Sequence, residues 1–251
     1  MFRTSWVAEK RAELSTLTDL PLPEIVPSRR DFTQFVATQK HGIALVPRLQ
    51  RANPASGRAW PALDLVAFAR ACDDSDAAAL AVRTAALFGN AVADLDAVAA
   101  AVTAPLLRDD FCLHERQVLQ SRLHGADAVL LPAAELDPAA LHDLSALASS
   151  LHMTSVIEVG SEAGLRAALP LHTACIGIAG TAPGGRADAQ RVRALASQVP
   201  RQRTVLLLDE VAALDELLPL SGVIDAAVVG DALLDVPDPA AAIAAVQARL
   251  G

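Results

Sequence analysis

The stretch Ala128-Val-Leu-Leu131 is an apolar run that lies between two longer segments with helical spacing, residues 115–124 and 138–151. A strand without polar alternation is buried on both faces, which is typical of a parallel sheet covered by helices. The stretch therefore predicts one strand–helix unit of an α/β fold.

The same unit recurs along the chain. Further apolar runs lie at residues 43–49, 78–82, 105–107, 155–159, 174–178, 204–208 and 226–229. Ala- and Leu-rich segments with helical spacing separate them, at residues 61–72, 94–102, 162–169, 188–198, 210–218 and 239–250. Eight such units, with no dinucleotide-binding glycine motif after the first strand, favour a single closed (β/α)₈ barrel over an open sheet.

A helical extension is predicted before the barrel. Residues 2–17 place Trp6, Val7 and Leu14 among charged residues, which indicates a helix. Prolines at 21, 23 and 27 end it, and Asp31 is a suitable N-cap for a short helix that runs to about residue 38. We therefore expect an extension over residues 1–40, packed on a barrel formed by residues 41–251.

Composition limits the class of protein. The chain is 53% hydrophobic but only 3% aromatic, and its net charge is −8 with a pI near 5.2. This balance argues against nucleic acid and anionic membranes as partners. Cys72, Cys112 and Cys175 show no paired spacing, and no apolar run approaches a membrane span. We expect a cytoplasmic protein with reduced thiols and no cofactor.

Several motifs carry a resemblance to one family. They are Arg51-Ala-Asn-Pro-Ala-Ser-Gly57, Leu107-Arg-Asp-Asp-Phe111, Val156-Ile-Glu-Val159, Ile176-Gly-Ile178 and Ile224-Asp-Ala-Ala-Val-Val-Gly230. In order and spacing, from about Trp6 to Ala248, the chain resembles indole-3-glycerol-phosphate synthase. The resemblance implies a TIM barrel and a lyase of tryptophan biosynthesis, which closes an indole ring with loss of carbon dioxide and water.

The residues at the family's functional positions differ here. By resemblance, the strand 1 Glu and Lys fall at Arg48 and Gln50, and the strand 3 Lys falls at Asp109. The strand 6 Asn and Arg fall at Ala179 and Thr181, and the strand 7 Glu-Ser-Gly falls near Leu208, Asp209 and Glu210. The strand 5 carboxylate alone is retained, as Glu158.

Lysine is almost absent from the chain. Lys10 and Lys40 are its two lysines, and both precede the first barrel strand, so no strand end can present one. Arg48 holds its proton too firmly, with a pKa above about 12, to act as a general acid. We therefore do not expect a lysine-dependent lyase reaction.

The mouth of the barrel is predicted to be acidic. Asp209, Glu210 and Asp231 stand where the resemblance implies a phosphate site, next to Gly230, and carboxylates repel a dianion. The expected ligand is therefore a small molecule other than a strongly anionic phosphate. Other ligand-binding candidates are Asn53 in the first motif and two aromatic residues that are either pocket wall or core, Phe88 and Phe111.

Other interpretations stay open at this stage. Glu158 is either a proton-transfer group or a structural partner of Arg48, and Arg48 with Asp109 forms either an internal salt bridge or a catalytic pair. Asp109, Glu158, Asp209 and Asp231 are spread around the mouth and need not converge, so we predict no metal. The Gly-rich stretch at residues 180–186 is either an anion cradle or a loop.

Three functions follow as hypotheses. The chain is an enzyme with an altered substrate, or a non-catalytic barrel that binds a small molecule or a protein partner. The third hypothesis is a genuine synthase whose substitutions are compensated elsewhere in the chain.

Overall fold

A computed structural model describes residues 2–17, 24–38, 42–75, 77–171, 175–179 and 187–250. Eight parallel strands close into a barrel, in the order β1-β10-β9-β8-β7-β6-β5-β4. These strands are β1 (Ala44–Leu49), β4 (Leu80–Val82), β5 (Leu106–Phe111), β6 (Ala128–Pro132), β7 (Thr154–Val159), β8 (Cys175–Ile178), β9 (Thr204–Leu207) and β10 (Ala226–Val229). The predicted single (β/α)₈ barrel is confirmed.

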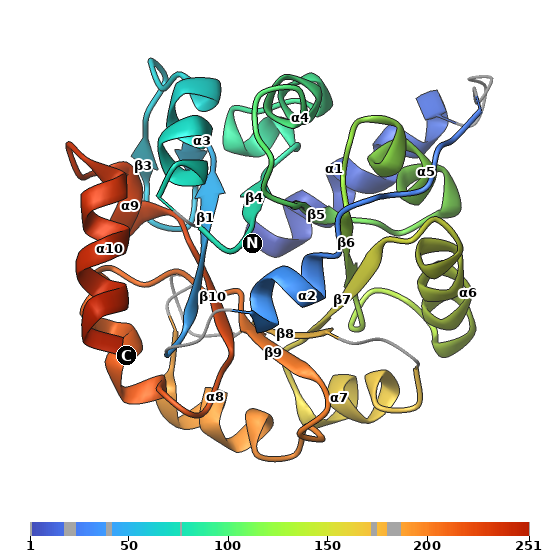
Figure 1. The fold of residues 1–251 in the computed structure, drawn as a ribbon. Helices are drawn as coiled ribbons and strands as arrows, with labels where there is room; N and C mark the ends of the chain where they lie inside the picture. The colour runs from blue at the N-terminus through green and yellow to red at the C-terminus, as the bar shows by residue number, and fades with distance from the viewer. Residues whose placement is uncertain are drawn as a thin grey trace.

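Helices surround the ring of strands (Figure 1). They are α3 (Leu65–Asp73), α4 (Val92–Ala99), α5 (Glu115–Leu123), α6 (Pro138–Ser150), α7 (Glu162–Ala168), α8 (Ala189–Ala196) and α10 (Pro239–Leu250), with a short helix α9 (Asp231–Leu234). Two 3₁₀ helices, η1 (Ala86–Phe88) and η2 (Leu214–Leu220), and a small hairpin of β2 (Ala52–Asn53) and β3 (Arg58–Ala59) complete the barrel. The sequence did not predict the hairpin or α9.

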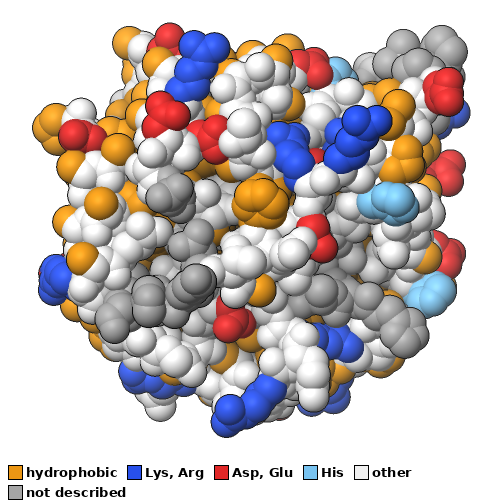
Figure 2. Space-filling model, viewed as in Figure 1, with side chains coloured by type: hydrophobic (Ala, Val, Ile, Leu, Met, Phe, Trp, Pro, Cys, Tyr) orange, Lys and Arg blue, Asp and Glu red, His pale blue; other side chains and the backbone are white. Residues whose placement is uncertain are grey.

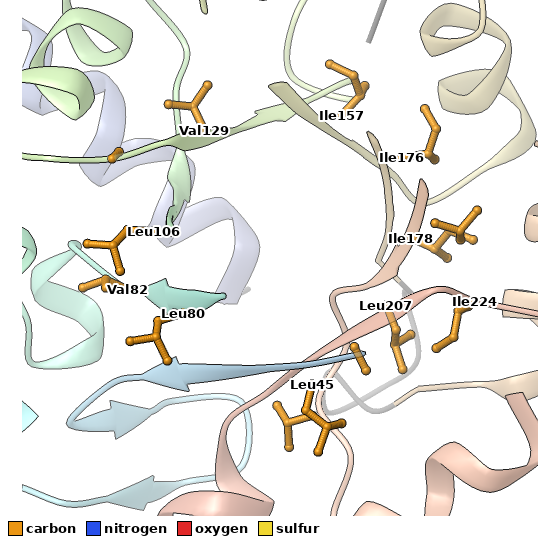
Figure 3. Packing of buried hydrophobic residues seen from close by; sticks show 14 of the residues in the cluster. Leu45, Leu80, Val82, Leu106, Val129, Ile157, Ile176, Ile178, Leu207 and Ile224 are labelled. Atoms are coloured by element: carbon orange, nitrogen blue, oxygen red, sulfur yellow. The ribbon is translucent and has the colours of Figure 1, made fainter. Parts of the chain in front are cut away.

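Alternation along the strands divides the core into two clusters. Residues such as Leu45, Leu80, Ile157 and Leu207 point outward and pack under the helices (Figure 3). The intervening positions, such as Val46 and Val156, point into the barrel and form an inner cluster. Successive side chains of a strand alternate between its two faces. Polar residues near the carboxyl end of a strand that point to the same side as the inner cluster therefore face the mouth of the barrel.

Two helices cover the two ends of this inner cluster. Helix α1 (Phe2–Leu17) contributes Trp6 at the carboxyl ends of the strands, and α2 (Phe32–Ala37) contributes Phe32 and Val36 at the other end. Helix α2 crosses the middle of the ring in Figure 1. Asp31 caps α2 as predicted, with its side chain accepting from the Gln34 N–H. The division at residue 40 stays a prediction.

The helix predicted over residues 210–218 was wrong. Residues 211–213 are not helical, and η2 begins only at Leu214 and contains Pro219. The reason is tertiary: Glu210 turns into the barrel to meet Arg48, and its carbonyl accepts from the Ala187 N–H. No helix in the described residues is long and apolar enough to cross a membrane.

Candidate active site

Arg48 is the centre of a buried polar network in the mouth. It is 1% exposed, and its Nε lies 2.6 Å from Asp109 Oδ2 while its Nη1 lies 2.6 Å from Glu210 Oε1. The remaining Nη2 donates to the Leu208 carbonyl at 2.8 Å. Burial by itself lowers the pKa of Arg48, but the two carboxylates outweigh it and hold that pKa above its usual value. The guanidinium therefore stays charged and links strands β5 and β1 to the end of β9.

Side-chain donors of the chain itself occupy the corner of the mouth where the resemblance implies a phosphate site. Asp231 Oδ1 accepts from Gln50 Nε2 at 3.1 Å and from Asn53 Nδ2 at 2.9 Å. Glu210 Oε2 accepts from the Asp231 N–H at 3.3 Å. A Cβ at Gly230 would lie 2.9 Å from Glu210 Oε1, so this corner is tightly packed. The predicted residues meet here, with amide groups opposite the carboxylate of Asp231.

Glu158 has a different partner from the expected one. It is 5% exposed, and its Oε1 accepts from Arg3 Nη1 at 2.5 Å, so the suggested pairing with Arg48 was wrong. Burial raises the pKa of this carboxyl, and the charge of Arg3 offsets the shift only in part. Glu158 is thus a group in the mouth whose proton affinity is shifted in the direction a general acid needs.

The aromatic candidates are held together by a residue from outside the barrel. Trp6 of α1 stacks on Phe111 with ring centroids 3.8 Å apart, and it meets Phe88 edge-on at 5.0 Å. No second ring fits between Trp6 and Phe111 at that separation. Arg83 lies over both Trp6 and Phe88, at 4.4 and 4.1 Å, and its burial lowers its pKa to about 10.

Helix α1 also brings a lysine into the mouth. Lys10 is 2% exposed, and its Nζ lies 2.6 Å from Asp110 Oδ2. Burial by itself raises the pKa of Asp110, but the charges of Lys10 and Arg108 outweigh it and hold the pKa below its usual value. The expectation that no strand end presents a lysine stands, yet a lysine reaches the strand ends by another route. The sequence did not predict this position of Lys10, because Lys10 belongs to a helix outside the barrel and the prediction considered strand ends alone.

Consecutive aspartates share this site because strand β5 is irregular. Its register against β6 shifts between Arg108 and Phe111, which is the effect of a bulge. Asp109 pairs with Arg48 inside the barrel, whereas Asp110 accepts from Trp6 Nε1 at 2.6 Å and from Thr84 Oγ1 at 2.6 Å. A bulge re-aims one side chain, so both carboxylates can be used.

The sequence held one signal for this helix. Arg3, Trp6, Lys10 and Glu13 recur at three- and four-residue intervals, which places them on one face of a helix. Glu9 adds a further contact, with its carboxylate accepting from the Ala86 N–H at 2.6 Å. A face that carries Trp and Lys together predicts docking onto an aromatic and acidic surface.

The remaining candidates lie at the edge of this network. Asp209 is buried at the end of β9, next to Glu210. Thr181 and the stretch 180–186 lie outside the described residues. Within the ranges that the structure describes, no three His, Cys, Asp or Glu side chains are grouped so that they could hold a metal ion.

Most groups that could transfer a proton are therefore engaged in ion pairs. Arg48, Lys10 and Arg3 each bind a buried carboxylate, at 2.5–2.6 Å. One buried acceptor, Gln50 Oε1, has no hydrogen-bond partner among the described residues. Within the described part of the mouth, the charged side chains therefore bind one another.

Comparison with known proteins gives a consistent result at the level of sequence. The family model described as indole-3-glycerol phosphate synthase matches residues 2–246. An indole-3-glycerol phosphate synthase of Mycobacterium ulcerans is 35% identical, covering 84% of this chain and 78% of the relative. One from Parafrankia sp. is 33% identical, covering 93% of this chain and 87% of the relative.

Solved structures share the fold with much lower identity. The 3-hexulose-6-phosphate synthase of Salmonella typhimurium has a TM-score of 0.63 at 14% identity, covering 83% of this chain and 98% of that one. The tryptophan synthase alpha chain of Legionella pneumophila has a TM-score of 0.61 at 13% identity, covering 89% and 96%. These matches support the barrel alone.

Proposed function

This chain belongs to the indole-3-glycerol-phosphate synthase family, and we propose that it is a non-catalytic member, a binding or regulatory barrel. The observation that carries the proposal is the position of Arg48 between Asp109 and Glu210, 2.6 Å from each. These three residues stand at positions where the resemblance implies catalytic and phosphate-binding groups. In this chain they bind one another.

The groups at these positions are unsuited to acid catalysis. Ring closure needs a general acid that protonates or polarises the substrate carbonyl. Arg48 is unsuited to this because its carboxylate neighbours raise its pKa further. The position of the strand 3 lysine holds Asp109, which is committed to Arg48. A non-catalytic barrel is the function most consistent with such groups.

The charge of the mouth is also unsuited to the phosphate of the synthase substrate. A phosphate bound in the family manner would meet Glu210 and Asp231, both less than 10% exposed. Within the described residues Asp231 has amide partners and no cation within ion-pair distance. The repulsion of a dianion by buried carboxylates amounts to several kcal/mol at the short separations of a binding site. A ligand of this mouth would therefore be neutral or cationic.

Two observations favour catalytic alternatives. Burial raises the pKa of Glu158, which suits a proton-transfer group in an enzyme with an altered substrate. Lys10 lies at the strand ends, which suits a genuine synthase with a compensating lysine. Both groups are held by ion pairs, so either reaction would require α1 to move.

A cytoplasmic location belongs to the same proposal. The three cysteines are buried thiols that form no disulfide, and burial raises the pKa of Cys72 to about 12. A buried thiol with a raised pKa does not form the thiolate that oxidation requires. This chemistry suits a reducing compartment.

An assay of indole formation tests the proposal. The full chain is mixed with the carboxyphenylamino-deoxyribulose phosphate substrate, and the Mycobacterium ulcerans relative is run alongside it. We expect a rate lower by about a thousandfold or more, since the loss of several transition-state contacts typically costs orders of magnitude. A rate comparable to the relative's would overturn the proposal. Lys10→Met would then show whether Lys10 supplies the acid.

A further inference from the structure

A cavity of about 770 Å³ lies on the face opposite the mouth. It is lined by residues of α2, by the C-terminal half of α6 and by the start of β7, which includes Thr154. Helices α2 and α6 stand on either side of β7 in Figure 1. Small-molecule sites commonly have volumes of about 300–1,000 Å³, so the cavity is large enough for a ligand.

The wall of this cavity is rich in hydroxyl groups. Thr33 Oγ1 lies 3.1 Å from Thr154 Oγ1, and Ser145 Oγ lies 2.8 Å from Ser155 Oγ. A hydroxyl pair uses only one of its two hydrogens, so the Thr33–Thr154 pair keeps one O–H to donate and lone pairs to accept. Ser149 adds an exposed hydroxyl. Groups that both donate and accept match the hydroxyls of a ligand.

Arg29 is the available cation of the cavity. It is exposed, and it makes no hydrogen bond or ion pair with any residue that the structure describes. The adjacent Arg30 is committed, since its Nε lies 2.7 Å from Asp127 and its Nη1 donates to the Ala104 carbonyl at 3.1 Å. Arg29 is therefore free to meet an anionic group.

Asp31 limits the charge that the cavity can accept. Its Oδ1 caps α2 by accepting from the Gln34 N–H at 3.0 Å, which leaves the other carboxylate oxygen to accept from a ligand hydroxyl. A carboxylate on the same wall as Arg29 disfavours a highly charged anion. Arg29 and Asp31 together therefore fit a ligand that carries a single anionic group.

His152 occupies an unusual backbone position at the rim. Its φ is +56°, and among the described residues it is the one non-glycine residue with a positive φ. It ends α6 in the position where glycine is favoured, with the Met153 N–H donating to the Ala148 carbonyl at 2.9 Å. Histidine in this conformation costs about 1 kcal/mol relative to glycine. His152 lines the cavity and is exposed, and its imidazole has no described partner.

We propose that this cavity binds a small polyhydroxylated molecule that carries one anionic group, such as a sugar phosphate or a sugar acid. The hydroxyls of Thr33, Thr154 and Ser149 bind the ligand's hydroxyls, and Arg29 with His152 binds its anionic group. The site goes beyond the proposed function, because it gives the barrel a ligand on the face opposite the mouth. Figure 2 shows that face, with basic, acidic and histidine side chains interspersed among uncharged groups.

Methionine NMR provides a local reporter of binding. The chain has two methionines, Met1 and Met153, and Met153 lines the cavity and is 4% exposed. With ¹³C-methyl methionine, and the signal assigned by Met153→Leu, the full chain is titrated with glucose 6-phosphate, gluconate, glucose and inorganic phosphate. We expect saturable shifts of the Met153 methyl with the first two, and binding about tenfold weaker or more with glucose or phosphate alone.

Matched variants test the assignment. Arg29→Ala and His152→Gly should each weaken glucose 6-phosphate binding by about tenfold. His152→Gly relieves the backbone and should unfold at the same or a higher temperature, so its weaker binding is not a loss of folding. Arg201→Ala, at an exposed site outside the cavity, should bind normally.

Three results would overturn the proposal. They are no response to either hydroxylated anion, an equal response to inorganic phosphate alone, and unchanged affinity in both Arg29→Ala and His152→Gly. The indole assay measures catalysis in the mouth, whereas this titration measures ligand binding on the opposite face. Either proposal can therefore fail without the other.

Discussion

Arg48 Nε and Asp109 Oδ2 lie 2.6 Å apart inside the barrel, and both side chains are at most 2% exposed. Each charge loses its hydration on burial, and the attraction between them is what makes that burial tolerable. Glu210 binds the same guanidinium from the opposite side. Arg48 is therefore the cation that both carboxylates share, and removing it would leave Glu210 buried without an ion-pair partner among the described residues.

Arg48→Met should lower the free energy of unfolding by about 3–5 kcal/mol, because Asp109 and Glu210 lose their shared cation. Urea denaturation measures the change. Arg51→Met is the matched control, since its pair with Asp94 at 3.0 Å is partly exposed and should contribute less than about 1 kcal/mol. Equal losses in the two variants would contradict a special role for the buried ion pairs.

Trp6→Ala should remove the contact that docks α1 on the mouth. The indole is 6% exposed and stacks on Phe111, so its loss should cost about 3–5 kcal/mol. Helix α1 should then be cleaved faster by trypsin, at Lys10 and Arg11. Trp60→Ala is the control, because Trp60 is only half-buried and bonds the exposed Asp235. Unchanged protection of Lys10 in Trp6→Ala would argue that the ion pairs alone hold the helix.

Glu158 should give the stability a pH dependence opposite to that of an ordinary carboxylate. Burial raises its pKa, so the folded chain holds this proton more tightly than the unfolded chain does. Stability is then lost as the pH rises from about 4.3, the unfolded pKa of Glu, through the higher folded pKa, and it is constant above that value.

The variant Glu158→Gln should lack this loss of stability with rising pH. Urea midpoints measured from pH 4 to pH 8 should show Glu158→Gln gaining on the natural chain as the pH rises. Glu162→Gln, at a site where the carboxylate is exposed, should run parallel to the natural chain. Parallel curves for both variants would mean that Glu158 keeps an ordinary proton affinity.

Two glycines should respond to alanine in opposite directions. A Cβ at Gly177 of β8 would lie 2.5 Å from Leu208 Cδ1 and 2.9 Å from Val156 Cγ1, so Gly177→Ala should cost about 1–3 kcal/mol. A Cβ at Gly164 of α7 would meet nothing closer than 3.6 Å, and Gly164→Ala should stabilise by about 0.5–1 kcal/mol. Thermal unfolding separates the two, and a stabilised Gly177→Ala would contradict the packing inside the barrel.

Local sequence patterns predicted the barrel and most of the helices around it. Apolar runs such as Ala128–Leu131 are local patterns, and a strand buried on both faces has few alternative folds. The N-cap at Asp31 was also predictable from local sequence, since the side chain of Asp31 accepts a hydrogen bond from an N–H only three residues away. The motifs that resemble the family were also local, and the comparisons confirmed the family that they indicated.

The other contacts of the candidate residues depended on the tertiary structure. Arg48 and Asp109 were paired correctly, because both lie at the carboxyl ends of barrel strands that the order of the fold brings together. The partner of Glu158 was not predictable in this way, since Arg3 comes from a helix outside the barrel. Lys10 and Trp6 were missed for the same reason. The helical spacing of Trp6 and Lys10 marks the face of α1 that docks, but it does not encode where on the barrel the helix lies, because that depends on packing between distant segments.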